Sequence, residues 1–239
     1  MDNRNERKIC IAAAVLGLAA LFLRRSLYSV GFDHKGLLTA WHPLAIALIA
    51  AALGMLAVTA ALVLPMKKET RLAPTGLLAG AGSFAMGAGL ACTALMGPAR
   101  GLSRPVVVLG LLAAAAMGLA GISQLKNRQP HFLTHGVLCL FLGFYLVTRY
   151  RAWSQDPQIL DYILALLGGT AMMVYSYHMA AGNLALASRR AWLSWGALGA
   201  FFGLAGAAGG EAVPLCLGGA LWILTGLWRG TAEGRTETV

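Results

Sequence analysis

The sequence is poor in charged residues and poorer still in acidic ones. Charged residues make up 12% of the 239 positions, with nine Asp and Glu against nineteen Lys and Arg. Soluble domains average about 25% charged residues, so this composition excludes an ordinary soluble domain. The basic residues lie mostly in pairs at the ends of apolar blocks, where anionic lipid headgroups would meet them. We therefore expect a lipid bilayer with anionic lipids as partner, and no nucleic acid.

Motifs of catalysis and cofactor binding are missing as well. The sequence contains no P-loop, no dinucleotide-binding glycine fingerprint, no H-E-x-x-H and no G-x-S-x-G. Its four cysteines, Cys10, Cys92, Cys139 and Cys216, stand alone in separate apolar blocks. They predict neither disulfides nor a thiolate metal site. We expect no cofactor, and an enzyme is the less favoured class.

Apolar blocks fill most of the chain, in which 58% of the residues are hydrophobic. A bilayer core of about 30 Å requires roughly 20 apolar residues per crossing helix. The blocks are rich in Ala, Leu and Gly and do not alternate with polar residues, which excludes a β-barrel. We predict an all-α transmembrane bundle forming a single integral membrane domain, 1–239, of about eight spans. These lie near residues 9–30, 43–65, 75–97, 105–125, 131–150, 159–187, 192–209 and 213–228.

The two halves of the chain share several features. Arg24-x-x-x-Tyr28-Ser29 ends the first span and Arg149-x-x-x-Trp153-Ser154 ends the fifth, and a proline stands near the start of every second span. One interpretation is two parallel four-helix halves, an arrangement known in transporters. The other is that proline is simply common in the first turn of helices. The sequence leaves both open.

Charged residues collect at one predicted face, which we expect to be the outer one. Ile9 to Leu23 gives only about 22 Å of helix, so the first span must continue past Arg24 and Arg25. Their guanidinium groups either reach headgroups or face protein. The candidate ligand-binding residues at this face are Arg24, Arg25, Asp33, Arg149, Arg151, Asp156 and Asp161. They predict either a ligand site or interhelical salt bridges with helix caps.

The sixth predicted span is the most polar. Small, polar or polarizable residues recur on one face at three- and four-residue steps: Asp161, Ala165, Gly168, Met172, Tyr175, Met179 and Gly182. We expect this face to point into the bundle. It forms either a dry helix contact or the wall of a wet cavity, and Tyr175 is a further ligand-binding candidate.

Histidines supply the only metal-binding candidates. His131 and His135 are spaced for one helix face, with Cys139 one turn further, and His178 is expected at a similar depth on the next span. Because no carboxylate lies nearby, packing at the membrane interface explains these residues better than a metal does.

Three functions fit these features. The leading interpretation is transport or binding of a small solute or ion, with a small anionic solute as ligand of a polar site open to the outer face. The alternatives are an accessory or assembly subunit of a membrane complex, and a small membrane-embedded enzyme or redox protein. The expected location is the bacterial cytoplasmic membrane.

Orientation follows from the basic residues of the connections. With the N-terminus in the cytoplasm, twelve Lys and Arg residues fall on the cytoplasmic side and seven on the outer side. Reporter fusions after Val239 are therefore expected to read cytoplasmic, and fusions within the 151–158 loop external. The reverse pattern would contradict the predicted topology.

Overall fold

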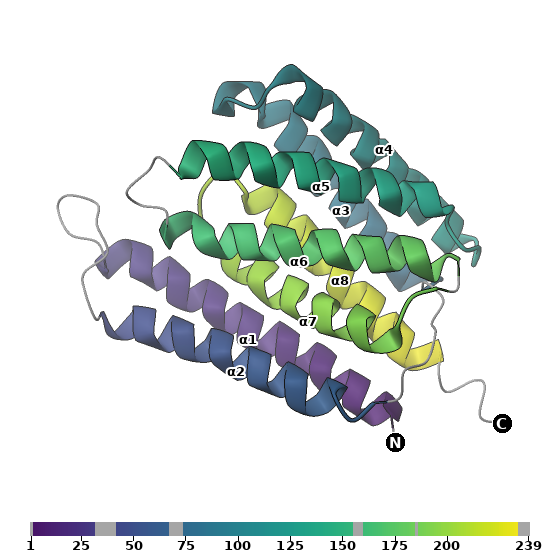
Figure 1. Cartoon of the computed structure of the whole chain (residues 1–239), viewed down its shortest axis with the longest axis horizontal. Coiled ribbons are helices and arrows are strands. Elements are labelled where there is room, and N and C mark those ends of the chain that lie inside the picture. Colours follow the sequence, from purple (N-terminus) through teal and green to yellow (C-terminus); the bar gives the residue numbers. More distant parts are fainter. Residues whose placement is uncertain (1, 32–41, 67–73, 155–159, 185, 234–239) are drawn as a thin grey trace.

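The computed structural model describes residues 2–31, 42–66, 74–154, 160–184 and 186–233. This part of the chain forms helices and loops only (Figure 1). The helices are α1 (Asp2–Val30), α2 (Pro43–Val63), α3 (Leu77–Met96), the short 3-10 helix η1 (Pro98–Arg100), α4 (Arg104–Leu125), α5 (Phe132–Trp153), α6 (Leu160–Gly182), α7 (Arg189–Gly206) and α8 (Val213–Glu233).

The chain is a multi-pass membrane protein built as a helical bundle. Among the described residues, six helices, α1 to α6, are long and apolar enough to cross a membrane. The other two helices fall below that measure: α7 has 18 residues but begins with Arg189 and Arg190 and is less apolar, and the apolar part of α8, Val213–Trp228, is shorter. The all-α prediction is confirmed, while the relation between the two halves stays a prediction.

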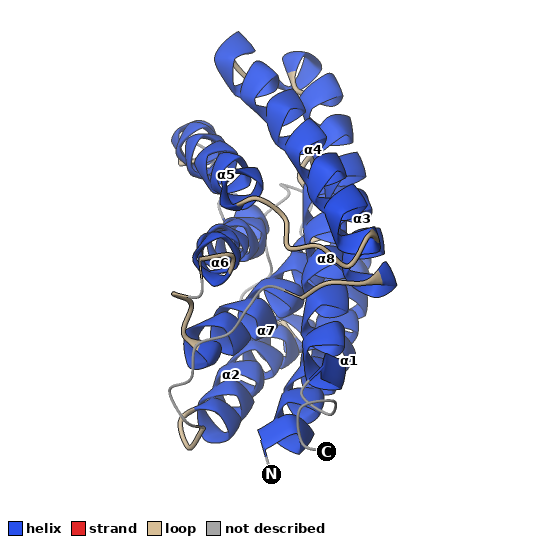
Figure 2. Cartoon of the chain, turned by 90° about the vertical axis from the view of Figure 1, so that its right-hand side faces the viewer, coloured by secondary structure: helices blue, strands red, loops and turns tan. Residues whose placement is uncertain are grey.

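Helices α7 and α8 lie at the centre of the bundle (Figure 2). α7 packs against α1, α2, α6 and α8, and α8 also packs against α1, α3 and α6. α4 packs on α3, and α5 joins α4 to α6. Because α7 is enclosed by four neighbours, it needs little of the hydrophobicity that a lipid-facing helix requires.

Both termini lie at the same end of the bundle (Figure 1). We call this the terminal end, and the opposite end, where α1, α5 and α7 finish and α2, α6 and α8 begin, the loop end. An even number of crossings requires both termini to share one side. The arrangement therefore agrees with eight crossings, while the location of the loop end at the outer face stays a prediction.

Local signals account for several helix boundaries. α2 begins at Pro43, whose missing N–H is not needed in a first turn, and the His42 side chain caps it by accepting from Leu44 N. α5 continues to Trp153, beyond the predicted end at 150. α6 ends at Gly182 rather than at 187, and the chain then turns back so that Leu186 N donates to Ala181 O at 2.9 Å.

Glycines bring the central helices into backbone contact. A Cβ atom added to Gly218 of α8 would lie 2.7 Å from Ala85 O of α3, and one added to Gly168 of α6 would lie 3.0 Å from the carbonyl carbon of Phe202 in α7. Lipid supplies no hydrophobic force between helices, so such close approach provides the packing energy. Helices α3 and α8, and likewise α6 and α7, are therefore tightly packed at these positions.

Replacing Gly218 by alanine should therefore destabilise the bundle. The new Cβ would meet backbone, which cannot move aside, and overpacking of this kind costs about 1–3 kcal/mol. Gly54→Ala in α2 is the matched control, because its added Cβ has no atom within 4 Å. Thermal unfolding in detergent should show a lower melting temperature for Gly218→Ala and no loss for Gly54→Ala. Equal melting temperatures would contradict the α3–α8 contact.

Candidate functional site

At the loop end, Arg24 of α1 binds the end of α7. It is buried, with 5% of its surface exposed. Its Nη1 donates to Ala205 O at 3.0 Å and its Nη2 to the Tyr28 hydroxyl at 2.8 Å. The last carbonyls of a helix lack intrahelical donors and carry partial negative charge. The guanidinium group satisfies one of them, which explains how this charge is tolerated inside the bundle.

Arg149 of α5 forms the second half of the site with Glu211. Its Nη1 lies 2.7 Å from Glu211 Oε2 and donates to Arg100 O at 2.9 Å. Arg100 in turn donates from Nη1 to Glu211 O at 2.6 Å. Gly210 adopts φ +82°, which an L side chain rarely tolerates, and so shapes the α7–α8 connection that presents Glu211. These bonds join η1, α5 and the α7–α8 connection.

Aromatic rings surround the two guanidinium groups. Arg149 Cζ lies 5.6 Å from the centre of the Tyr145 ring and 5.7 Å from that of Trp153. Trp153 stacks on Tyr162 of α6 with ring centres 4.4 Å apart. Cation–π contacts stabilise a desolvated arginine, so the rings help to keep a buried positive charge at this end.

We call Arg24, Tyr28, Arg149, Trp153, Tyr162 and Glu211 together the Arg24–Arg149 cluster. A small cavity lies among these residues. The cavity has a volume of about 20 Å³, room for about one water molecule. Its lining includes Arg24, Tyr28, Trp153, Tyr162, Ala165 and Glu211. Arg149, whose partners Glu211 and Trp153 line the cavity, is only 4% exposed, and its Nε has no hydrogen-bond partner in the part of the chain that the structure describes. A buried donor without an acceptor is costly, so a ligand or water is expected to fill this position.

The structure brings together part of the predicted site. Arg24 and Arg149 join the cluster, and Arg25, which is exposed, reaches Ala208 O at 3.5 Å. Arg151 is exposed on the opposite face of α5 from Arg149. The predictions for Asp33, Asp156 and the Asp161 side chain lie outside the described residues. Sequence analysis missed Glu211, although it is the only acidic residue between Asp161 and Glu233.

The inward face of α6 is a dry helix contact. Met172 is fully buried, and its side chain occupies the space left by Gly203 of α7 and Gly219 of α8. Tyr175 is fully buried too, with its ring centre 4.9 Å from that of Trp222 and 5.9 Å from that of Trp192. The face points inward as predicted. Tyr175 lies about 20 Å along α6 from Tyr162, so the structure does not bring it to the Arg24–Arg149 cluster.

Each of the three histidines has contacts of its own. His131 caps α5 by accepting from Leu133 N at 3.4 Å, whereas His135 is fully buried and stacks on Trp222 with ring centres 5.9 Å apart. The ring of His178 lies against Tyr177. In the described segments, no three His, Cys, Asp or Glu side chains gather as metal ligands would.

A second charged contact, at the terminal end, was also missed. Glu6 of α1 is fully buried, and its Oε1 accepts from Arg189 Nε of α7 at 2.5 Å. The neighbouring Arg190 donates to Met66 O of the segment after α2. Arginines at both ends of the bundle thus hold α1 against α7.

Comparison with families of known proteins, with curated proteins and with solved structures finds no match for this chain. Its chemistry is therefore argued from its own residues.

The two ion pairs should differ in their contribution to stability. Glu6 is fully buried and the Arg189 side chain is 10% exposed, whereas the Glu211 side chain is 39% exposed. Breaking a buried pair costs about 3–5 kcal/mol, because the remaining charge stays buried without its partner. The Arg149–Glu211 pair is half-exposed, and Arg149 keeps its bond to Arg100 O, so its loss should cost less. Unfolding in detergent should therefore show a large loss for Glu6→Gln and a small one for Glu211→Gln. Equal losses would contradict the assigned burial.

Proposed function

We propose that this membrane protein binds a small anionic solute at the loop end, in the Arg24–Arg149 cluster. The observation that carries the proposal is the unpartnered Nε of Arg149, a buried donor on a cationic group whose partners Glu211 and Trp153 line a water-sized cavity. Carboxylate and phosphate oxygens are the acceptors that a guanidinium group binds best, because its N–H groups match their geometry.

The charge of the loop end favours an anion. In the sequence, its connections and helix ends carry seven basic residues, Arg24, Arg25, Lys35, Arg100, Arg104, Arg149 and Arg151. They carry four acidic ones, Asp33, Asp156, Asp161 and Glu211. The basic residues remain in excess even if every carboxylate is ionised. Such a surface raises the local concentration of anions and speeds their arrival.

Glu211 acts in this proposal as an internal competitor. Its carboxylate occupies Arg149 Nη1 and is partly exposed, so an incoming anion can displace it without opening the core. Removing the Glu211 charge should therefore strengthen anion binding, whereas removing the Arg149 charge should abolish it.

We further propose that the loop end faces the outside of a bacterial cytoplasmic membrane. The support is the distribution of basic residues, twelve on the terminal side against seven on the loop side. The ligand would then arrive from the exterior, and both termini would lie in the cytoplasm.

An accessory or assembly subunit is the second candidate, favoured by the dry contact of α6 with α7 and α8. A subunit that only supports a complex needs no solute path, and Met172 fills the space where such a path would run. Its loop-end arginines would then serve only to hold helices together. The third alternative, an enzyme or redox protein based on the histidines, has no comparable support, because in the described segments no three possible metal ligands gather around them.

Anion-dependent stabilisation separates the first two candidates. The purified chain in detergent is titrated with inorganic phosphate, sulfate or acetate at constant ionic strength, and its melting temperature is recorded. A ligand at 100 times its Kd stabilises the folded state by about 2.7 kcal/mol, so a saturable rise is expected. Glu211→Gln should shift the midpoint to lower concentration, and Arg149→Gln should remove the response.

Arg104→Gln is the control, because Arg104 is exposed at the same end and outside the cluster. It should respond as the unchanged chain does. No response of the unchanged chain to any of the three anions would favour the accessory subunit, and so would the same response in Arg149→Gln.

A further inference from the structure

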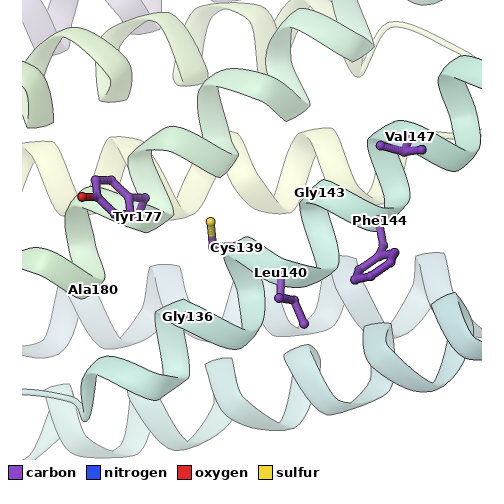
Figure 3. A pocket seen from close by; sticks show the side chains of 8 residues that line it. All are labelled: Gly136, Cys139, Leu140, Gly143, Phe144, Val147, Tyr177 and Ala180. Atoms are coloured by element: carbon purple, nitrogen blue, oxygen red, sulfur yellow. The ribbon is translucent and has the colours of Figure 1, made fainter.

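Away from the cluster, the outer surface of α5 and α6 carries an apolar groove of about 570 Å³ (Figure 3). Its lining comes mainly from α5, with Tyr177 and Ala180 from α6 (Figure 3). The α5 residues are Gly136, Cys139, Leu140, Gly143, Phe144 and Val147. Because the groove lies on the lipid-facing side of two membrane helices, its natural occupant is hydrocarbon rather than water.

Missing side chains produce the hollow. A Cβ atom added to Gly136 has nothing within 4 Å, and one added to Gly143 has only Met173 Sδ, at 3.7 Å. Leu140 and Phe144 remain 55% and 56% exposed on the same surface. An acyl chain lying in the groove contacts protein on several sides, whereas an acyl chain on a flat helix surface contacts protein on one side. Dispersion contacts of this kind are individually small but add up.

The groove runs along the middle of α5 (Phe132–Trp153). Gly136 to Val147 spans about 16 Å of helix, and Gly136 to Arg151 about 22 Å, so a chain anchored at Arg151 would reach past the centre of a hydrocarbon core of about 30 Å. An acyl chain lying along α5 would fill this length.

A positive charge stands at one end of the groove. Arg151 follows Val147 by one turn, on the same face of α5 as Leu140, Phe144 and Val147, and it is exposed. Cα–Cβ bonds in a helix tilt toward its amino terminus, so the Arg151 side chain starts toward Val147. A phosphate group about 6 Å beyond the apolar groove would lie within its reach.

We propose that this groove binds an anionic phospholipid, with one acyl chain along Gly136–Val147 and its phosphate on Arg151. The site is distinct from the Arg24–Arg149 cluster, because Arg149 points into the bundle and Arg151 away from it. The lipid belongs to the leaflet at the loop end and keeps α5 and α6 covered where their own side chains leave space.

Lipid retention tests the proposal. The full chain is purified from vesicles of phosphatidylglycerol and phosphatidylcholine with identical acyl chains, and retained lipid is counted by native mass spectrometry. Phosphatidylglycerol should be retained in preference to phosphatidylcholine. Arg151→Gln should weaken its binding about five-fold, the equivalent of the roughly 1 kcal/mol that one basic residue gains near anionic lipid. Gly143→Trp, which fills the groove, should abolish retention.

Matched controls use positions outside the groove. Arg104→Gln removes an exposed arginine at the same end, and Gly118→Trp adds a side chain to α4 where an added Cβ has nothing within 4 Å. Both should retain lipid as the unchanged chain does. Equal retention of the two lipids, or loss of binding in both controls, would overturn the proposal. So would oxidative cross-linking of two chains through Cys139 in a variant lacking the other cysteines, because a second copy would then occupy the groove.

Discussion

Backbone-to-backbone packing around α7 and α8 is the constraint on which the rest of the structure depends. Gly168, Gly203 and Gly218 lie where neighbouring helices leave no room for a side chain, and Met172 fills the remaining space between α6, α7 and α8. In lipid, helices gain little by hiding apolar surface from each other, so this fit supplies the cohesion. A centre packed in this way leaves no room for water or for solvated charge.

Charge is consequently displaced to the two ends of the bundle. At the terminal end Glu6 pairs with Arg189, and at the loop end Arg24 binds the last turn of α7 while Arg149 pairs with Glu211. Each contact joins helices that are distant in sequence. Among the described residues, the loop end combines such contacts with the unpartnered Nε of Arg149 and a cavity lined by Arg24 and Glu211, which is why the proposed anion site is placed there.

The sequence was sufficient to predict the helices, because a long run of apolar residues can satisfy its own backbone hydrogen bonds in a bilayer only as a helix. It also placed Arg24 and Arg149 among the charged candidates of the outer face, but it did not separate them from Arg25 and Arg151, which the structure leaves exposed. The ion pairs of Glu211 and Glu6 were not predicted, because an acidic residue in a connection or in a charged terminus is usually exposed to solvent. Their ion pairs depend on which helices become neighbours, and residue spacing along one helix does not determine that.

The claim that the centre is closed and that chemistry is confined to the loop end is tested most directly by thiol accessibility. Single cysteines are placed at Arg151 and Met172 in a chain lacking its native cysteines, and a membrane-impermeant thiol reagent is applied to the folded protein from the loop end. Arg151→Cys should react, while Met172→Cys should react only after denaturation, because Met172 is fully buried. Rapid labelling of Met172→Cys in the folded protein would reveal a water path along α6 and contradict the account.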